Sequence, residues 1–107
     1  NTFKLYDMGA ISFMTGGYGT SVKEAFDKAV ADAIDEHGND SYNGTISTCD
    51  GSYSELRKFT FEKDREIIRW LQDDENIFDN AEKHGPARYF KSKDHENLYY
   101  FFGIAAV

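Results

Sequence analysis

The chain has 107 residues, of which 40% are hydrophobic and 16% aromatic, so we expect one domain with a packed core and not a disordered segment. Its formal net charge of −7 has the wrong sign for a protein that holds nucleic acid through phosphate contacts. Cys49 is the one cysteine, which excludes an intrachain disulfide and a cysteine-rich zinc site.

The charges are unevenly spread along the chain. Residues 24–55 hold eight acids and one base, and residues 73–82 hold five acids and no base, so the rest of the chain is basic on balance. A basic strip of Arg57, Lys58, Lys63, Arg65 and Arg69 leaves direct binding to nucleic acid open, but the overall balance favours a partner that is not nucleic acid. No apolar run is long enough to cross a bilayer and no apolar leader opens the chain, so we expect no membrane contact and a cytoplasmic location.

The first expected elements are a strand and a helix. Residues 3–14 are strand-like and aromatic, and the sequence TGGYGTS at residues 15–21 then predicts a turn. Apolar residues recur every three or four positions from Val22 to His37, which predicts an amphipathic helix. Ser21 and Glu24 form a capping box at its start, and Gly38 is suited to end it.

The middle of the chain is expected to form two short strands and a second helical region. Residues 37–48 connect the first helix to a strand at 45–48, and a weaker strand follows at 55–61. Residues 63–84 are helical in pattern, with a kink or break expected at Asp73 and Asp74.

The tail is expected to form a hairpin of residues 87–93 and 97–107. Its second strand is apolar on both faces, which predicts a central strand or one that pairs with a second copy. The order β-α-β-β-α-β-β predicts a single α+β domain over residues 1–107, a two-layer sandwich. Its sheet is mainly antiparallel, with four to five strands and two helical regions mostly on one face. A ferredoxin-like core with one added strand is one compatible topology.

Three motifs suggest chemistry, and for each a structural interpretation is favoured. The GGYG stretch at 16–19 precedes a helix start, where a phosphate could bind, but it lacks the lysine and spacing of a nucleotide loop. His37 with Asp35, Glu36 and Asp40 resembles a metal or acid–base group, yet neighbouring positions on a helix point in different directions. Cys49 precedes an aspartate, which would make the thiol less reactive. We therefore predict no catalytic residues, no metal and no cofactor.

The acidic clusters are the strongest candidates for function. Several carboxylates sit at the C-terminal end of the first helix, where the helix dipole disfavours negative charge. The candidate partner-binding residues are Asp32, Asp35, Glu36, Asp40, Asp73, Asp74, Glu75 and Asp79. The alternative is that these residues only form solvated faces that keep the protein soluble.

Residues 24–48 resemble an uncharacterised family of small phage-encoded proteins. The shared pattern is an alanine-rich helix that begins with Glu-Ala-Phe and is followed by His-Gly, a tyrosine and Gly-Thr-Ile. In this chain the matching residues are Glu24, Ala25, Phe26, His37, Gly38, Tyr42, Gly44, Thr45 and Ile46. The resemblance implies a phage origin and thus the cytoplasm of an infected bacterium, but it supplies no activity and no catalytic residue.

From these observations we expect a binding protein and not an enzyme. The first hypothesis is a stoichiometric inhibitor of the anti-CRISPR or anti-restriction type. Its carboxylates would meet the basic nucleic-acid-binding surface of a host defence protein, in one version as a DNA mimic. The alternatives are a small ligand-binding, phosphate-binding or enzymatic domain that uses the glycine-rich stretch and the loop from His37 to Tyr42, or a phage assembly accessory that forms a homo-oligomer.

Overall fold

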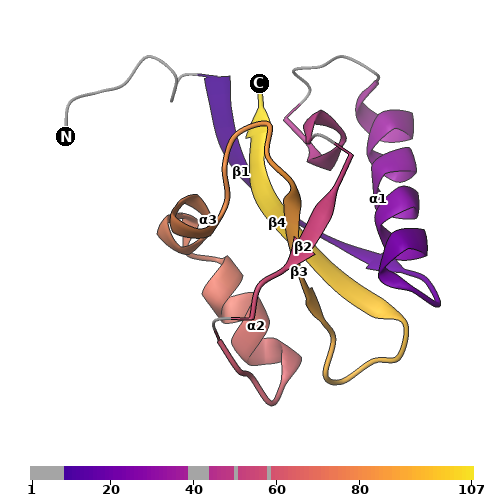
Figure 1. The fold of residues 1–107 in the computed structure, drawn as a ribbon, viewed down its shortest axis with the longest axis vertical. Helices are drawn as coiled ribbons and strands as arrows, with labels where there is room; N and C mark the ends of the chain where they lie inside the picture. Colours follow the sequence, from indigo (N-terminus) through magenta and orange to yellow (C-terminus); the bar gives the residue numbers. More distant parts are fainter. Residues whose placement is uncertain (1–8, 39–43, 50, 58) are drawn as a thin grey trace.

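The computed structural model describes residues 9–38, 44–49, 51–57 and 59–107. Within these ranges the chain forms four strands, three helices and a short 3₁₀ turn (Figure 1). In chain order these are β1 (Ala10–Tyr18), α1 (Val22–His37), η2 (Ile46–Thr48), β2 (Tyr53–Glu55), α2 (Asp64–Leu71), α3 (Asp74–Asn80), β3 (Ala87–Lys91) and β4 (Leu98–Ala106).

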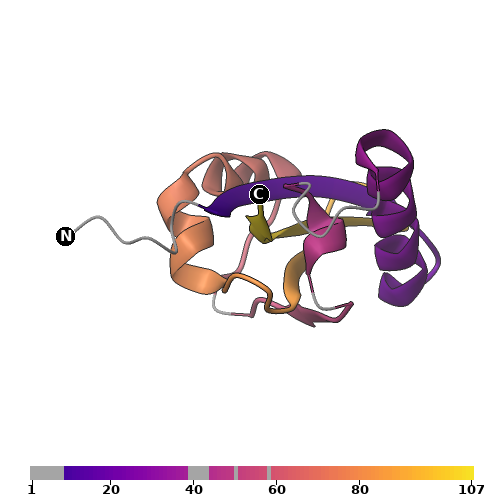
Figure 2. The same cartoon turned by 90° about the horizontal axis from the view of Figure 1, so that it is seen from above.

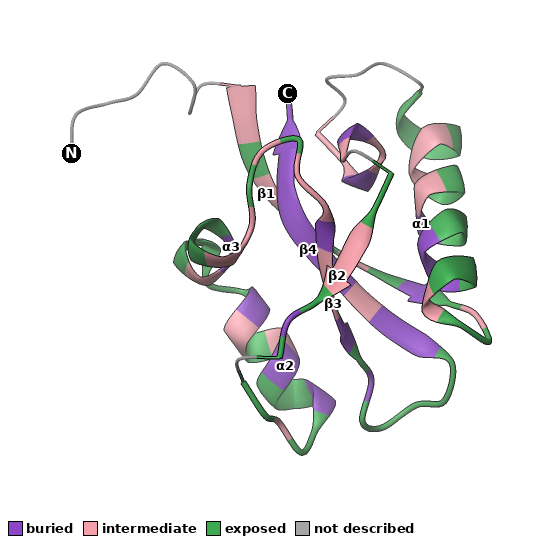
Figure 3. Ribbon diagram, viewed as in Figure 1, coloured by how far each residue is buried: buried purple, intermediate pink, exposed green. Residues whose placement is uncertain are grey.

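The strands form one open sheet in the order β1-β4-β3-β2. β4 pairs antiparallel with β1 and β3, and the short β2 pairs parallel with β3. The predicted fold class is confirmed: an α+β sandwich with a mainly antiparallel sheet and two helical regions. β4 is the central strand that the apolar tail predicted, and Figure 3 shows it buried along nearly its whole length. β1 pairs along the whole of β4, and β3 pairs with residues 99–102 on the other side of β4.

Alternate residues of β4 belong to two hydrophobic clusters on opposite faces of the sheet. Phe101 packs against Phe26 of α1, with ring centroids 5.6 Å apart. The next residue, Phe102, packs in the other cluster with Ile67 of α2 and Ile77 of α3. Helices therefore cover both faces, α1 on one side and α2 with α3 on the other (Figure 2). The expectation that the helices lie mostly on one face, as in a ferredoxin-like core, is wrong.

Most of the glycine-rich stretch belongs to a strand, so the break predicted over residues 15–21 is confined to residues 19–21. Gly16, Gly17 and Tyr18 complete β1 and pair with β4. A Cβ atom on Gly17 would lie 2.6 Å from the carbonyl oxygen of Ala25, and one on Gly19 would lie 2.5 Å from the nitrogen of the same residue. Glycine is needed here because the first turn of α1 rests directly on the backbone that leads into it.

The predicted strand at residues 45–48 is also wrong. Thr45 caps the turn η2, since its Oγ1 accepts the N–H of Ser47 at 3.2 Å. Thr48 donates its hydroxyl to the carbonyl of Thr45 at 3.0 Å and accepts the N–H of Ala106 at 3.0 Å. Hydroxyl side chains that bond to nearby backbone favour such turns over an extended strand. Residues 39–43 of the predicted connector lie outside the described residues.

The second helical region is interrupted at Asp73 and Asp74, as predicted. α2 ends at Leu71, and Asp73 caps α3 by accepting the N–H of Glu75 at 3.0 Å. The strand predicted at 55–61 is shorter and earlier, because Phe61 leaves the sheet edge and packs its ring edge-on against Phe90, 5.6 Å away.

Candidate functional site

Both predicted acidic groups lie exposed on or beside helices. We call Asp32, Asp35 and Glu36 the α1 acids, and Asp73, Asp74, Glu75 and Asp79 the α3 acids. Asp40, the remaining predicted member, lies outside the described residues. The α1 acids occupy the last turns of α1, where the helix dipole opposes them, so their position does not serve the stability of the helix.

Neither group is paired with a lysine or arginine in the described part of the chain. The ion pairs there join Lys23 to Asp27 at 2.6 Å, Arg57 to Glu55 at 3.0 Å and, when the histidine is protonated, His37 to Glu36 at 3.2 Å. An exposed carboxylate with no cation beside it keeps its charge available to a partner. Several such carboxylates close together produce a negative potential that extends into the solvent.

The two groups lie on opposite faces of the sheet, but both adjoin β1. Asp32 and Glu36 line a groove of about 250 Å³ whose other wall includes residues 13–16 of β1. On the opposite face, the hydroxyl of Ser12 in β1 donates to Oδ1 of Asp74 at 2.7 Å. The structure does not merge the α1 and α3 acids into one surface. It places them on either side of the same strand.

A carboxylate of the chain lies beside the N-terminus of α1. Ser21 Oγ accepts the N–H of Glu24 at 3.2 Å, which confirms that half of the predicted capping box. The carboxylate of Glu24 accepts the backbone N–H of Thr20 at 2.6 Å and also its hydroxyl at 3.2 Å. The backbone hydrogen bond from Thr20 lowers the pKa of Glu24, so the carboxylate remains charged. The charged carboxylate of Glu24 therefore lies beside the start of α1, where its charge opposes a bound phosphate.

The predicted histidine group is not assembled as a site among the described residues. His37 contacts Glu36, whereas Asp40 and Tyr42 lie outside the described ranges. No cluster of three histidine, cysteine, aspartate or glutamate side chains with the arrangement of a metal site occurs in the described part of the chain. Cys49 is half-buried and lies directly after η2.

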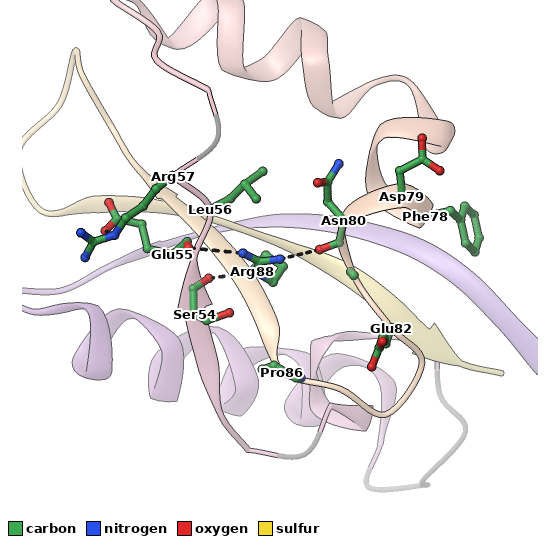
Figure 4. Close-up of a pocket in the computed structure, with 11 residues that line it drawn as sticks. Ser54, Glu55, Leu56, Arg57, Phe78, Asp79, Asn80, Glu82, Pro86 and Arg88 are labelled. Atoms are coloured by element: carbon green, nitrogen blue, oxygen red, sulfur yellow. Dashed lines mark hydrogen bonds and ion pairs between the residues drawn. The ribbon is translucent and has the colours of Figure 1, made fainter.

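A large cleft was not anticipated from the sequence. It measures about 860 Å³ and lies between β2, β3 and the end of α3 (Figure 4). At its centre Arg88 donates hydrogen bonds to the carbonyl oxygens of Asn80 at 2.7 Å, Glu55 at 3.3 Å and Ser54 at 3.4 Å. Arg88 thus ties α3 to the edge of the sheet, and its role is to hold these elements together. An arginine among the apolar and aromatic residues Ala87, Tyr89 and Phe90 was the signal that could have revealed it.

A buried carboxylate is the second feature that sequence reasoning missed. Asp64, the first residue of α2, is 4% exposed and accepts hydrogen bonds from the loop between β3 and β4. Burial alone would raise its pKa, but the hydrogen bonds from Ser92, Lys93 and Tyr100 outweigh burial and hold the pKa below its ordinary value of 3.8. All its partners belong to the chain itself, so this cluster is structural. A lone aspartate at a helix start gives no sequence signal of burial.

No family model, no characterised protein and no solved structure matches the chain. None of the described helices combines the length and the apolar character that crossing a membrane requires.

Proposed function

We propose that this chain is a non-enzymatic binding protein whose carboxylates occupy a basic surface on another protein. The observation that carries the proposal is that the α1 and α3 acids are exposed and have no lysine or arginine partner among the described residues. Such groups speed association with a positively charged surface, and the attraction weakens as salt screens it.

The partner class that fits this chemistry best is a host defence protein that holds nucleic acid in a basic channel, as CRISPR effectors do. In this proposal the chain is a phage protein that inhibits its target by stoichiometric binding in the cytoplasm of the infected cell, with carboxylates where phosphates would otherwise lie. The net charge of −7 and the resemblance of residues 24–48 to phage proteins support this choice. A channel that contacts both acidic groups must enclose β1, because the groups flank that strand from opposite faces.

A small ligand-binding domain or enzyme is less well supported. A phosphate at the start of α1 would lie beside the charged carboxylate of Glu24, which accepts the N–H and the hydroxyl of Thr20 there. Such a domain would also need His37, Asp40 and Tyr42 to converge, and only His37 of these lies in the described ranges.

DNA-cleavage assays with guide-loaded CRISPR effectors and with restriction endonucleases test the proposal. We expect the chain to abolish cleavage by its target near equimolar concentration. The triple variant D32K/D35K/E36K should require at least about tenfold more protein, because three attractive charges become repulsive.

The matched control is E62K/E66K/E96K, which changes the net charge equally at exposed positions away from both acidic groups. Equal loss in both variants would show that net charge matters and the α1 acids do not. Full inhibition by D32K/D35K/E36K would refute the role of these acids, and no inhibition of any enzyme at large molar excess would refute the partner class.

A further inference from the structure

The two edges of the sheet are very different. β2, at one edge, has three residues and ends at the charged Glu55. β1, at the other edge, has nine residues and contains neither a charged side chain nor a proline. Proteins usually protect a sheet edge with short strands, charges or prolines, because unpaired backbone groups invite another strand. β1 has none of these protections along its own sequence.

The register shows which backbone groups of β1 are free. The N–H of Gly19 donates to Asn97 at 2.8 Å, and the N–H of Val107 donates to Gly9 at 2.9 Å. These bonds place the odd-numbered residues of β1 in hydrogen-bonded pairs with β4. The even-numbered residues turn their N–H and C=O groups outward, and they are Ala10, Ser12, Met14, Gly16 and Tyr18. In the described ranges these outward groups have no backbone partner.

The side chains beside this edge are apolar along the strand and acidic on either side of it. Ile11, Met14 and Tyr18 are 48%, 40% and 58% exposed, which is unusual for large hydrophobic residues on a strand. Asp32 and Glu36 flank the strand from the α1 face. From the other face, Asp74 bonds directly to Ser12.

We infer that β1 receives an extended, basic segment of the partner protein as a fifth strand of the sheet. Successive side chains of an added strand point to alternate faces, so they would meet the α1 acids and the α3 acids in turn. Lysines and arginines at neighbouring positions would then each find carboxylates, while backbone hydrogen bonds hold the segment. This inference rests on the proposed function and specifies how the partner is held.

A second copy of the chain is the less suitable occupant. Two copies joined through β1 would bring their acidic groups together across the new pair of strands, and each copy carries a net charge of −7. Like charges that face each other across an interface oppose association, whereas a basic segment is attracted.

Hydrogen exchange measured by NMR with a synthetic peptide tests the inference. The probe is a capped octapeptide of valine, threonine, lysine and arginine with basic residues at successive central positions. At saturation we expect the amides of Ser12, Met14 and Gly16 to exchange at least about tenfold more slowly, because each gains a strand partner. The amides of Phe13 and Thr15 already pair with β4 and should change little.

Two charge-matched control peptides separate strand addition from simple attraction. Each carries methyl groups on one alternate set of backbone nitrogens, so one blocks the edge that faces β1 and the other blocks only the outer edge. The peptide that is blocked on the edge facing β1 should lose about fivefold in affinity or more for each blocked hydrogen bond. The peptide that is blocked on its outer edge should bind as tightly as the unmethylated peptide. Equal binding of all three peptides would overturn strand addition and leave the proposed function standing.

Two further outcomes would also overturn the inference. If D32K/D35K/E36K bound the parent peptide as tightly as the unmodified chain, the choice of a basic segment would be wrong. Slow exchange of the Ser12, Met14 and Gly16 amides without peptide, together with a dimer in sedimentation, would assign the edge to a second copy.

Discussion

Replacing Asp64 with asparagine should destabilise the fold, although the two side chains have nearly the same shape. The carboxylate is 4% exposed and accepts four hydrogen bonds. The donors are the Ser92 hydroxyl at 2.6 Å, the Lys93 N–H at 2.7 Å, the Tyr100 hydroxyl at 2.8 Å and the Asp94 N–H at 3.3 Å. Together they fasten the loop between β3 and β4 to the start of α2.

An asparagine can satisfy only part of this arrangement. Its oxygen can still accept the backbone N–H groups of Lys93 and Asp94, but its NH₂ group would then face the two hydroxyls. Ser92 Oγ already accepts N–H groups from Asp94 at 3.2 Å and His95 at 2.9 Å, so it has no lone pair left for another donor. At least one charge-assisted hydrogen bond is lost, which predicts a cost of about 2–3 kcal/mol in the free energy of unfolding.

Urea denaturation followed by the fluorescence of Trp70, the one tryptophan, measures this cost. E66Q is the control, because Glu66 is an exposed carboxylate on the same helix and should change stability by less than about 0.5 kcal/mol. Because hydrogen bonds lower the pKa of Asp64 in the fold despite its burial, its contribution is complete above pH 3.8 and is lost as the pH falls further. The difference between D64N and the unmodified chain should therefore shrink in acid. A loss below about 0.5 kcal/mol at neutral pH, or a difference that grows in acid, would refute the reasoning.

Three further predictions concern single side chains. Burial, and then the hydrogen bond to a carboxylate, raises the pKa of Tyr100 to about 12. Its contribution to stability is thus present below pH 10 and lost as the pH rises through about 12, so the stability gap between Y100F and the unmodified chain should close over that range in alkaline denaturation curves. Gly17→Ala should cost about 1–3 kcal/mol in thermal unfolding because its Cβ would press on the Ala25 carbonyl, whereas Gly16→Ala makes only ordinary contacts and should cost less than about 1 kcal/mol. Equal effects of the two alanines would contradict the packing argument. Arg88→Lys should cost about 1–2 kcal/mol in urea denaturation, since an ammonium cannot match the three-carbonyl geometry, and an unchanged midpoint would contradict the role assigned to the guanidinium.

The sequence predicted best those elements whose signal is local. The helix over residues 22–37 has apolar periodicity, a serine cap and a terminal glycine, and α1 has these bounds. The break at Asp73 was equally local, because an aspartate cap satisfies the free N–H of Glu75 whatever lies further away. Likewise, a strand apolar at nearly every position can only be stable when both its faces are covered, as β4 is.

The errors arose where distant contacts decide the structure. Gly17 resembles a turn residue in isolation, yet it is required in a strand because α1 packs on it. Asp64 and Arg88 were not predicted, because their importance depends on partners up to 36 residues away in the sequence. The exposure of the α1 and α3 acids could be predicted, but the fact that both flank β1 could not, since it follows from the order of the strands.

The position of the acidic groups bears on whether they act only as solubilising charge. A chain that leaves a nine-residue strand unprotected at a sheet edge risks pairing with copies of itself. Charged side chains within β1 would prevent this self-pairing, but they would also repel from β1 any partner segment with a charge of the same sign. Carboxylates on the two flanking helices repel other copies of this chain equally well and leave the backbone of β1 open to a segment of opposite charge. Solubility alone would be served by acids placed anywhere on the surface. Their position on both sides of β1, an edge strand of the described sheet, is what the proposed binding of a basic strand requires.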